Sequence, residues 1–161
     1  MTPKLIRMTA LIAAVAMMAV ATPVAARQQQ VPFKARYAGT QEITSGPPIL
    51  NFNLVVAGNA THLGKFTGVQ HHVVDVNNPL EFSDGTYTFS AANGDTIFGG
   101  YFGHVEPLPN GDVIFHGAWS IEGGTGRFND ATGGGSATGL GHSDLTFTLE
   151  LDGTITSVGS K

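Results

Sequence analysis

The residues of this chain that could do chemistry are histidines, tyrosines, hydroxyls and carboxylates, because the sequence contains no cysteine. Thiol nucleophiles, thiolate zinc sites and disulfide frameworks are therefore excluded. His71 and His72 are adjacent, and neighbouring side chains on a strand point to opposite faces, so this pair is poorly placed to chelate one ion. A three-histidine site would need further histidines from other strands: His62, His104, His116 or His142. We predict no metal and no cofactor.

Three residues are the candidates for moving a proton: Glu122, His72 and Tyr37. A carboxylate or imidazole held in a cavity has a shifted pKa and could act in a cyclisation or an isomerisation. Glu122 follows an apolar stretch, where the lining of a cavity would meet its rim. The structural interpretation of each residue is a hydrogen-bonded side chain or a rim charge.

The glycine-rich segments do not match the motifs of hydrolases or nucleotide-binding proteins. The nearest string to a nucleophile elbow, residues 135–139, has its serine one position too early, and no helix is expected after it. The glycine runs also lack the Lys-Ser/Thr ending of a phosphate loop. Serine hydrolysis and nucleotide binding therefore have no support.

The elements that would position these candidates are strands, because the apolar pattern has a period of two. Phe147, Leu149 and Leu151 alternate with polar residues, which is typical of a half-buried antiparallel strand, and the prediction includes Leu145 on the same inner face. Similar alternation predicts about nine strand-like stretches. They cover residues 34–43, 49–58, 60–69, 70–76, 85–92, 95–104, 112–121, 136–151 in one or two pieces, and 153–158.

Turn signals and internal glycines favour a closed barrel. Four dipeptides typical of tight hairpins lie between or beside these stretches: Asp84-Gly85, Asn93-Gly94, Asn110-Gly111 and Asp152-Gly153. Glycines inside the strand pattern, such as Gly99 and Gly117, would permit the bulges and coiling that closure requires. We predict an all-β protein with a closed antiparallel β-barrel of about eight strands.

An eight-stranded barrel is just wide enough to be filled by side chains or to hold one small ligand. The alternation pattern then assigns a set of inward residues that mixes aromatic rings with a few polar groups. The predicted ligand-binding residues are Tyr37, Gln41, Phe52, His72, Tyr101, Phe115, Trp119 and Phe147.

The first 26 residues predict export. Lys4 and Arg7 precede an apolar run over residues 10–21, and Val24-Ala25-Ala26 supplies small residues for cleavage after Ala26. This run is too short to span a membrane and is typical of a signal peptide. We expect a flexible leader over 27–33, a single barrel domain over 34–161, and a secreted or periplasmic protein without a membrane anchor.

Charge limits the partners of this domain. Charged residues make up 12% of the chain, against roughly 25% in an average globular protein. Removal of Lys4 and Arg7 with the peptide would leave six basic residues against twelve acidic ones. A net negative protein is disfavoured as a partner of nucleic acids and of anionic membranes.

Two segments resemble a known family. Residues 124–133, followed by a glycine-rich stretch and an alternating strand, resemble the late strands of the allene oxide cyclase and dirigent barrel group. Residues 60–66 resemble a pattern in small exported bacterial proteins of uncharacterised function related to that group. The resemblance implies an eight-stranded barrel with an apolar cavity and a homo-oligomer, a trimer or a dimer. It carries over none of the catalytic residues of the plant members.

Three functions remain open at this level. The first is a module that binds a small apolar or aromatic molecule in the cavity. The second is a cofactor-independent cyclase or isomerase acting on such a molecule, which needs in addition a buried acid–base group. The third is a structural or interaction protein, in which the barrel is filled by its own side chains.

Overall fold

The computed structural model describes residues 29–156, so the predicted signal peptide lies outside the described residues. The chain forms strands almost throughout this range, with one short 3₁₀ helix, η1 (Gly126–Phe128). The strands are β1 (Gln30–Ile43), β2 (Ile49–Ala60), β3 (Gly64–Asp75), β4 (Glu81–Ala91), β5 (Thr96–Pro107), β6 (Val113–Ile121), β7 (Gly123–Gly124), β8 (Gly133–Gly141) and β9 (Thr146–Thr156). None of the helices in this range is long and apolar enough to cross a membrane.

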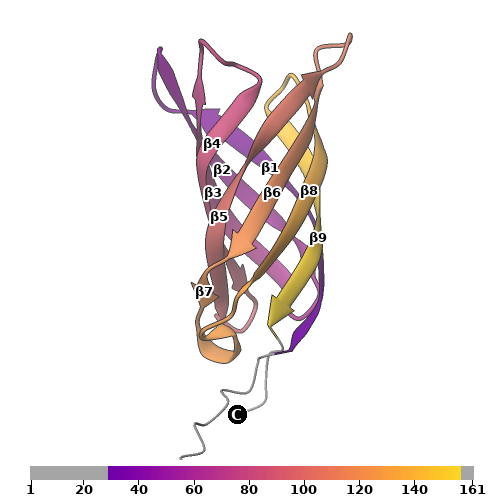
Figure 1. Cartoon of the computed structure of the whole chain (residues 1–161). Coiled ribbons are helices and arrows are strands. Elements are labelled where there is room, and N and C mark those ends of the chain that lie inside the picture. Colours follow the sequence, from indigo (N-terminus) through magenta and orange to yellow (C-terminus); the bar gives the residue numbers. More distant parts are fainter. Residues whose placement is uncertain (1–28, 157–161) are drawn as a thin grey trace, which may run out of the picture.

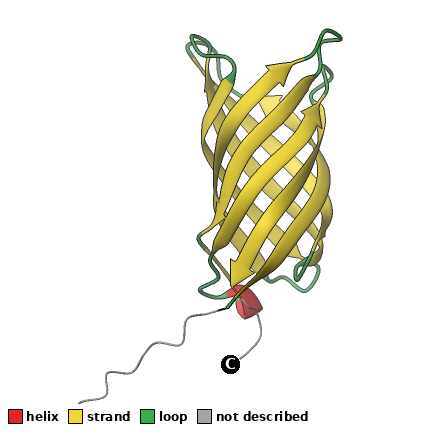
Figure 2. Ribbon diagram, turned by 45° about the vertical axis from the view of Figure 1, so that its right-hand side comes forward, coloured by secondary structure: helices red, strands yellow, loops and turns green. Residues whose placement is uncertain are grey.

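Eight of these strands close into an antiparallel barrel, as predicted (Figures 1 and 2). Each barrel strand pairs with the next one along the chain, and β9 pairs with β1 to complete the ring. The two-residue strand β7 only adds to the lower part of β5. The arrangement is an up-and-down barrel, which leaves no long unpaired sheet edge.

The two ends of the barrel are built differently. The lower end carries η1, the turns that follow β2 and β4, the first residues of β1 and the last residues of β9 (Figure 1). The upper end carries four connections, at residues 44–48, 76–80, 108–112 and 142–145. The barrel interior between them is lined by alternate residues of every strand.

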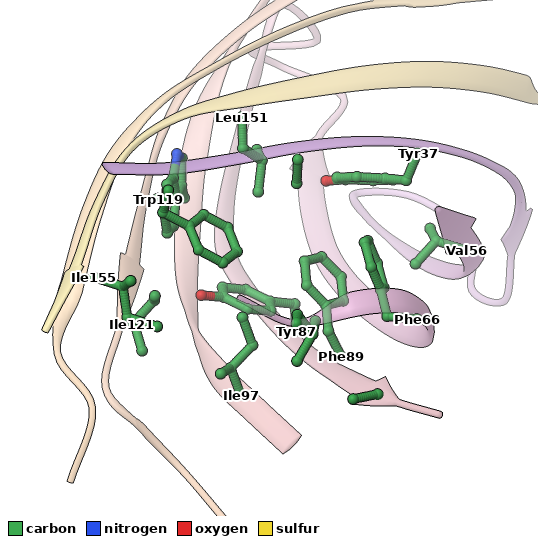
Figure 3. Packing of buried hydrophobic residues seen from close by; sticks show 14 of the residues in the cluster. Tyr37, Val56, Phe66, Tyr87, Phe89, Ile97, Trp119, Ile121, Leu151 and Ile155 are labelled. Carbon is green, nitrogen blue, oxygen red and sulfur yellow. The ribbon is translucent and has the colours of Figure 1, made fainter. Parts of the chain in front are cut away.

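The lower end is sealed by apolar side chains. Phe128 of η1 reaches back into the barrel and is fully buried. Phe33, Ile97 and Ile155, from three different strands, are equally inaccessible. Figure 3 shows Ile97, Ile155 and neighbouring residues of this cluster directed into the interior. No solvent path into the barrel is therefore available through these packed side chains.

Glycines on the inner face make room for the aromatic rings of the core. Every inward position of β8 except Ala137 is a glycine: Gly133, Gly135, Gly139 and Gly141. Gly103 and Gly117 face each other across β5 and β6, and the ring of Phe82 packs against both. A Cβ atom at Gly103 would lie 2.7 Å from that ring, and one at Gly117 would lie 2.6 Å from the backbone oxygen of Phe102, so neither position has room for a side chain. These glycines allow close packing within the sheet.

Several predicted boundaries are wrong. β1 begins at Gln30, inside the predicted leader 27–33, because Phe33 is buried and residues 30–33 pair with the end of β9. Residues 60–69 and 70–76 were predicted as two strands, but residues 64–75 form the single strand β3. Leu145 lies in the turn before β9 with a left-handed backbone and an exposed side chain, not on the inner face.

Two of the four predicted turn dipeptides do not make turns. Asp84-Gly85 lies within β4, where the register with β3 and β5 shifts and Asp84 adopts a positive φ, so it forms a β-bulge. Asp152-Gly153 lies within β9, and Gly153 pairs with Phe33 and Gly135. The other two, Asn93-Gly94 and Asn110-Gly111, lie in the connections after β4 and β5. Of these four dipeptides, two lie in turns and two lie within strands.

Candidate functional site

Most of the predicted site residues line a small cavity inside the barrel. Six of them line it: Tyr37, His72, Tyr101, Phe115, Trp119 and Phe147. Phe52 stacks directly on His72, with ring centroids 5.0 Å apart. Gln41 is half-buried near the upper end of β1 and does not line the cavity.

The cavity is small because aromatic side chains fill most of the barrel. Its volume is about 40 Å³, which is room for a few water molecules, since one water needs roughly 10–15 Å³. Figure 3 shows Tyr37 of β1, Tyr87 and Phe89 of β4, and Trp119 of β6 converging into the same interior space. Tyr37 makes edge-on contacts with Phe66 and Phe89 at centroid distances of 5.9 and 5.4 Å.

Two pairs of polar side chains lie among these rings in the lining of the cavity. The side-chain amide of Gln70 donates a hydrogen bond to the Tyr37 hydroxyl at 3.0 Å. The Nδ1 atom of His72 lies 2.9 Å from the Tyr101 hydroxyl. Gln70 and His72 are both on β3, two residues apart, so strand alternation points both side chains inward.

Two side-chain atoms of these pairs are left without any hydrogen-bond partner among the described residues. Among the described residues, every fully buried side-chain nitrogen or oxygen has a hydrogen-bond partner. The Nε2 atom of His72 and the Oε1 atom of Gln70 are in no hydrogen bond within residues 29–156. Both atoms therefore reach open space, and both residues line the cavity. They are the polar groups that an occupant of the cavity would meet.

His72 sits in an aromatic surround at the upper end of the site. The ring of Phe52 is stacked on it, and Phe82 and Tyr101 lie at centroid distances of 5.2 and 5.8 Å. Burial, and secondarily the neighbouring His71, lower the pKa of His72 from 6.5 to about 4. The imidazole is therefore neutral near pH 7, with one nitrogen as donor and the other as acceptor.

The other interior polar groups are also held neutral. Burial raises the pKa of Tyr37, and the hydrogen bond from Gln70 opposes this rise only in part. Burial likewise raises the pKa values of Tyr87 and Tyr101. The Tyr87 hydroxyl donates to the backbone oxygen of Ser120 at 2.7 Å, so it is already used in the structure. The site is an uncharged, mainly aromatic environment.

Glu122, predicted as an acid–base candidate, does not reach the cavity. Its side chain is exposed on the outer surface, where Oε1 accepts a hydrogen bond from the Ser120 hydroxyl at 3.2 Å. The reason is alternation: Trp119 and Ile121 point inward, so Glu122 falls on the outer side of the wall. None of the carboxylates in the described part of the chain is buried.

The histidines are distributed over both faces of the barrel. His71 and His72 point to opposite sides, and the Nε2 atom of His71 lies 3.1 Å from the Asn51 side-chain oxygen on the other side of the wall. His62 contacts the backbone oxygen of Pro32 at the lower end, and His142 pairs with Asp112 at the upper end. In residues 29–156 no group of three or more ligand-type side chains is arranged to hold a metal ion.

Sequence reasoning missed Gln70, Phe82 and Tyr87, which all line the cavity. The signal for Gln70 was available, since it lies two residues before His72 on the same strand. Phe82 was missed because the predicted strand covers residues 85–92, whereas β4 begins at Glu81 and includes Asp84-Gly85 as a bulge. Tyr87 was expected on a strand, but its face could not be linked to the cavity until the register was known.

Comparisons with known proteins add no relative. A scan against protein-family models finds no match for this chain, and searches of curated proteins and of solved structures find none either. The functional argument therefore rests on the geometry of the barrel itself.

Proposed function

We propose that the protein binds a small, planar, mainly apolar molecule in the upper half of the barrel, with one hydrogen-bonding group directed at His72. The observation that carries the proposal is the pair of free atoms, Nε2 of His72 and Oε1 of Gln70, in an otherwise aromatic cavity. A few convergent polar groups in an apolar enclosure are what small-molecule sites have in common.

The upper end supplies the entrance. Phe52, Tyr101, Phe115 and Leu149 are only half-buried, whereas the side chains at the lower end are fully packed. A cavity of about 40 Å³ is smaller than the roughly 150 Å³ that holds benzene in an engineered protein core. Binding therefore requires these half-buried rings to turn outward, which costs less than moving a fully packed ring.

Binding is favoured over catalysis by the protonation states of the site. A general base works best when its pKa lies near the working pH. The pKa of His72 is about 4, and those of the cavity tyrosines are raised by burial. With Glu122 on the outside, the cyclase or isomerase alternative has no well-matched acid–base group.

We also propose that the barrel acts outside the cytoplasm, after removal of residues 1–26. The support is the basic and apolar pattern of the N-terminal sequence together with the small residues before Arg27. Terminal sequencing of the protein recovered from its own host should begin at Arg27. A protein that begins at Met1 or Thr2 would contradict export by this route.

The experiment that tests binding compares phenol with benzene as ligands. Binding is measured by the fluorescence of Trp119 and by native mass spectrometry. Phenol should bind more tightly than benzene by roughly 2- to 10-fold, since one net hydrogen bond contributes about 0.5–1.5 kcal/mol. The substitution His72→Phe should abolish this preference. His71→Phe is the matched control, because the side chain of His71 points out of the barrel. The His71→Phe variant should retain the preference for phenol.

Phe115→Ala, which removes a half-buried ring at the entrance, should strengthen the binding of both probes. Absence of saturable binding in the unmodified protein and in Phe115→Ala would contradict the proposal. That result would favour the alternative of a structural or interaction protein with a filled barrel.

A further inference from the structure

A second pair of histidines lies on the outer surface of the barrel and does not line the cavity. His104 on β5 and His116 on β6 are directly opposed in the register of the two strands. Their rings are stacked, with centroids 5.3 Å apart and an interplanar angle of 24°. Alternation places both side chains on the solvent side, since Gly103 and Gly117 occupy the inward positions beside them.

Carboxylates flank this histidine pair on both sides. Glu106 follows His104 by two residues on the same face, and its Oε2 lies 3.7 Å from Nε2 of His116. Glu81 on β4 is the cross-strand partner of His104. Strands β4, β5, β6 and β8 contain no lysine or arginine. The local charge therefore favours a cation, and no basic side chain of these strands competes for the carboxylates.

We propose that His104 and His116 together bind a divalent transition-metal ion, with Glu106 as the third donor. Directly opposed residues of neighbouring strands have Cβ atoms about 4.5–5.5 Å apart. The two rings are stacked, so each must rotate about its side-chain torsions to turn one nitrogen toward a shared ion, at the roughly 2.0–2.1 Å of a zinc–nitrogen bond. Glu106 already lies beside the Nε2 of His116 and needs only a side-chain rotation to complete the set.

The donor set defines the class of ion. Imidazole nitrogens with one carboxylate suit zinc, nickel and copper, whereas calcium and magnesium prefer oxygen ligands throughout. No group of three or more donors is pre-arranged in residues 29–156, so the three side chains must reorient on binding, and water molecules would fill the positions that they leave open. Such a site is exposed and open, unlike a closed structural zinc site.

The test is a calorimetric titration of the full chain, carrying no polyhistidine tag, with zinc chloride and with nickel chloride. One ion should bind per chain. Even the outer partners of metal ligands contribute about 10–100-fold to affinity, so His104→Gln and His116→Gln should each weaken binding at least tenfold. Glu106→Gln should have a smaller effect.

His142→Gln is the matched control. His142 also pairs with a carboxylate, Asp112 at 3.2 Å, but it has no second histidine opposite to it. Its loss should leave the affinity unchanged. In a nuclear magnetic resonance spectrum, nickel should broaden the ring signals of His104 and His116 first, which locates the ion without any substitution. No binding up to millimolar zinc, or undiminished binding in both histidine variants, would overturn the proposal.

Discussion

The lower and the upper ends of this barrel are formed by the same strands but are packed differently. At the lower end, Phe128, Phe33, Ile97 and Ile155 are completely inaccessible to solvent. At the upper end, the rings of Tyr101 and Phe115 are only half-buried and border the cavity, and the half-buried ring of Phe52 is stacked on His72 beside it. The comparison shows tight apolar packing at one end and looser packing around polar groups at the other, and the second is where we propose that a ligand binds.

The chemistry of the two ends explains the difference. The interior of the lower end is filled by apolar side chains apart from the buried Thr156, and η1 adds the ring of Phe128 to them. The upper half places Gln70, His72 and Tyr101 among the rings, and these groups need partners that aromatic side chains do not fully supply. A polar group that is only partly satisfied is easier to expose or to pair with a ligand.

The largest effect is expected from removing the ring of Phe128. Phe128→Ala should lower the free energy of unfolding by about 3–5 kcal/mol, because a fully buried ring leaves a cavity that the packed surroundings cannot fill. Phe102→Ala is the control, since Phe102 is 64% exposed, and it should change stability by less than about 0.5 kcal/mol. Urea unfolding measures both. Equal losses in the two variants would show that the lower end is not a seal.

The next effect concerns pH at the upper end. His72 has a pKa of about 4 in the folded protein against 6.5 when unfolded, so the unfolded chain binds more protons between these values. Stability from this residue is therefore fully present above about pH 6.5 and is lost as the pH falls toward 4, by about 3 kcal/mol in total.

His72→Gln should flatten this part of the pH profile, whereas His71→Gln should leave it unchanged. Urea unfolding at a series of pH values is the measurement. If His72→Gln and the unmodified protein lose stability in parallel between pH 6.5 and 4, His72 is not held neutral by burial.

A smaller effect is expected from Tyr101→Phe. This change removes the hydroxyl that pairs with Nδ1 of His72 and should lower stability by about 1 kcal/mol, at the low end of the range for an unpaired polar group because the cavity can admit water. Tyr101→Phe should change the free energy of phenol binding more than it changes the free energy of unfolding. A loss of stability comparable to that of Phe128→Ala would mean that the upper end is packed as tightly as the lower.

The smallest effect belongs to the ion pair beside the lower end. Lys34 and Asp152 are cross-strand partners where β9 closes onto β1, with Nζ and Oδ2 2.8 Å apart, and both side chains are exposed. Lys34→Met should lower stability by at most about 1 kcal/mol, less in high salt. A much larger loss in thermal unfolding would mean that charge at this closing seam, besides apolar packing, holds the lower end together.

The sequence was sufficient to predict the barrel, because alternation and glycine content both follow from the geometry of a closed sheet. Strand ends were harder to predict, since Asp84-Gly85 and Asp152-Gly153 have the composition of turns but serve as a bulge and as a close backbone contact. Only the register between strands distinguishes these roles, and register is a long-range property.

The candidate site was predictable in part for the same reason. Tyr37, His72 and Trp119 lie on faces that alternation alone assigns, and the structure brings them to one cavity. The pairing of His72 with Tyr101, and of Gln70 with Tyr37, joins strands that are distant along the chain and left no local pattern. The size of the cavity depends on how the rings interlock, which composition does not determine.

Mapping of phenol binding by nuclear magnetic resonance tests whether a ligand enters at the upper end and meets His72. We expect saturable shifts in the side-chain signals of His72, Phe52, Tyr101 and Phe115, with the signals of Phe33, Phe128 and Ile155 unchanged. Shifts scattered over the outer surface, or shifts largest at the lower end, would contradict it.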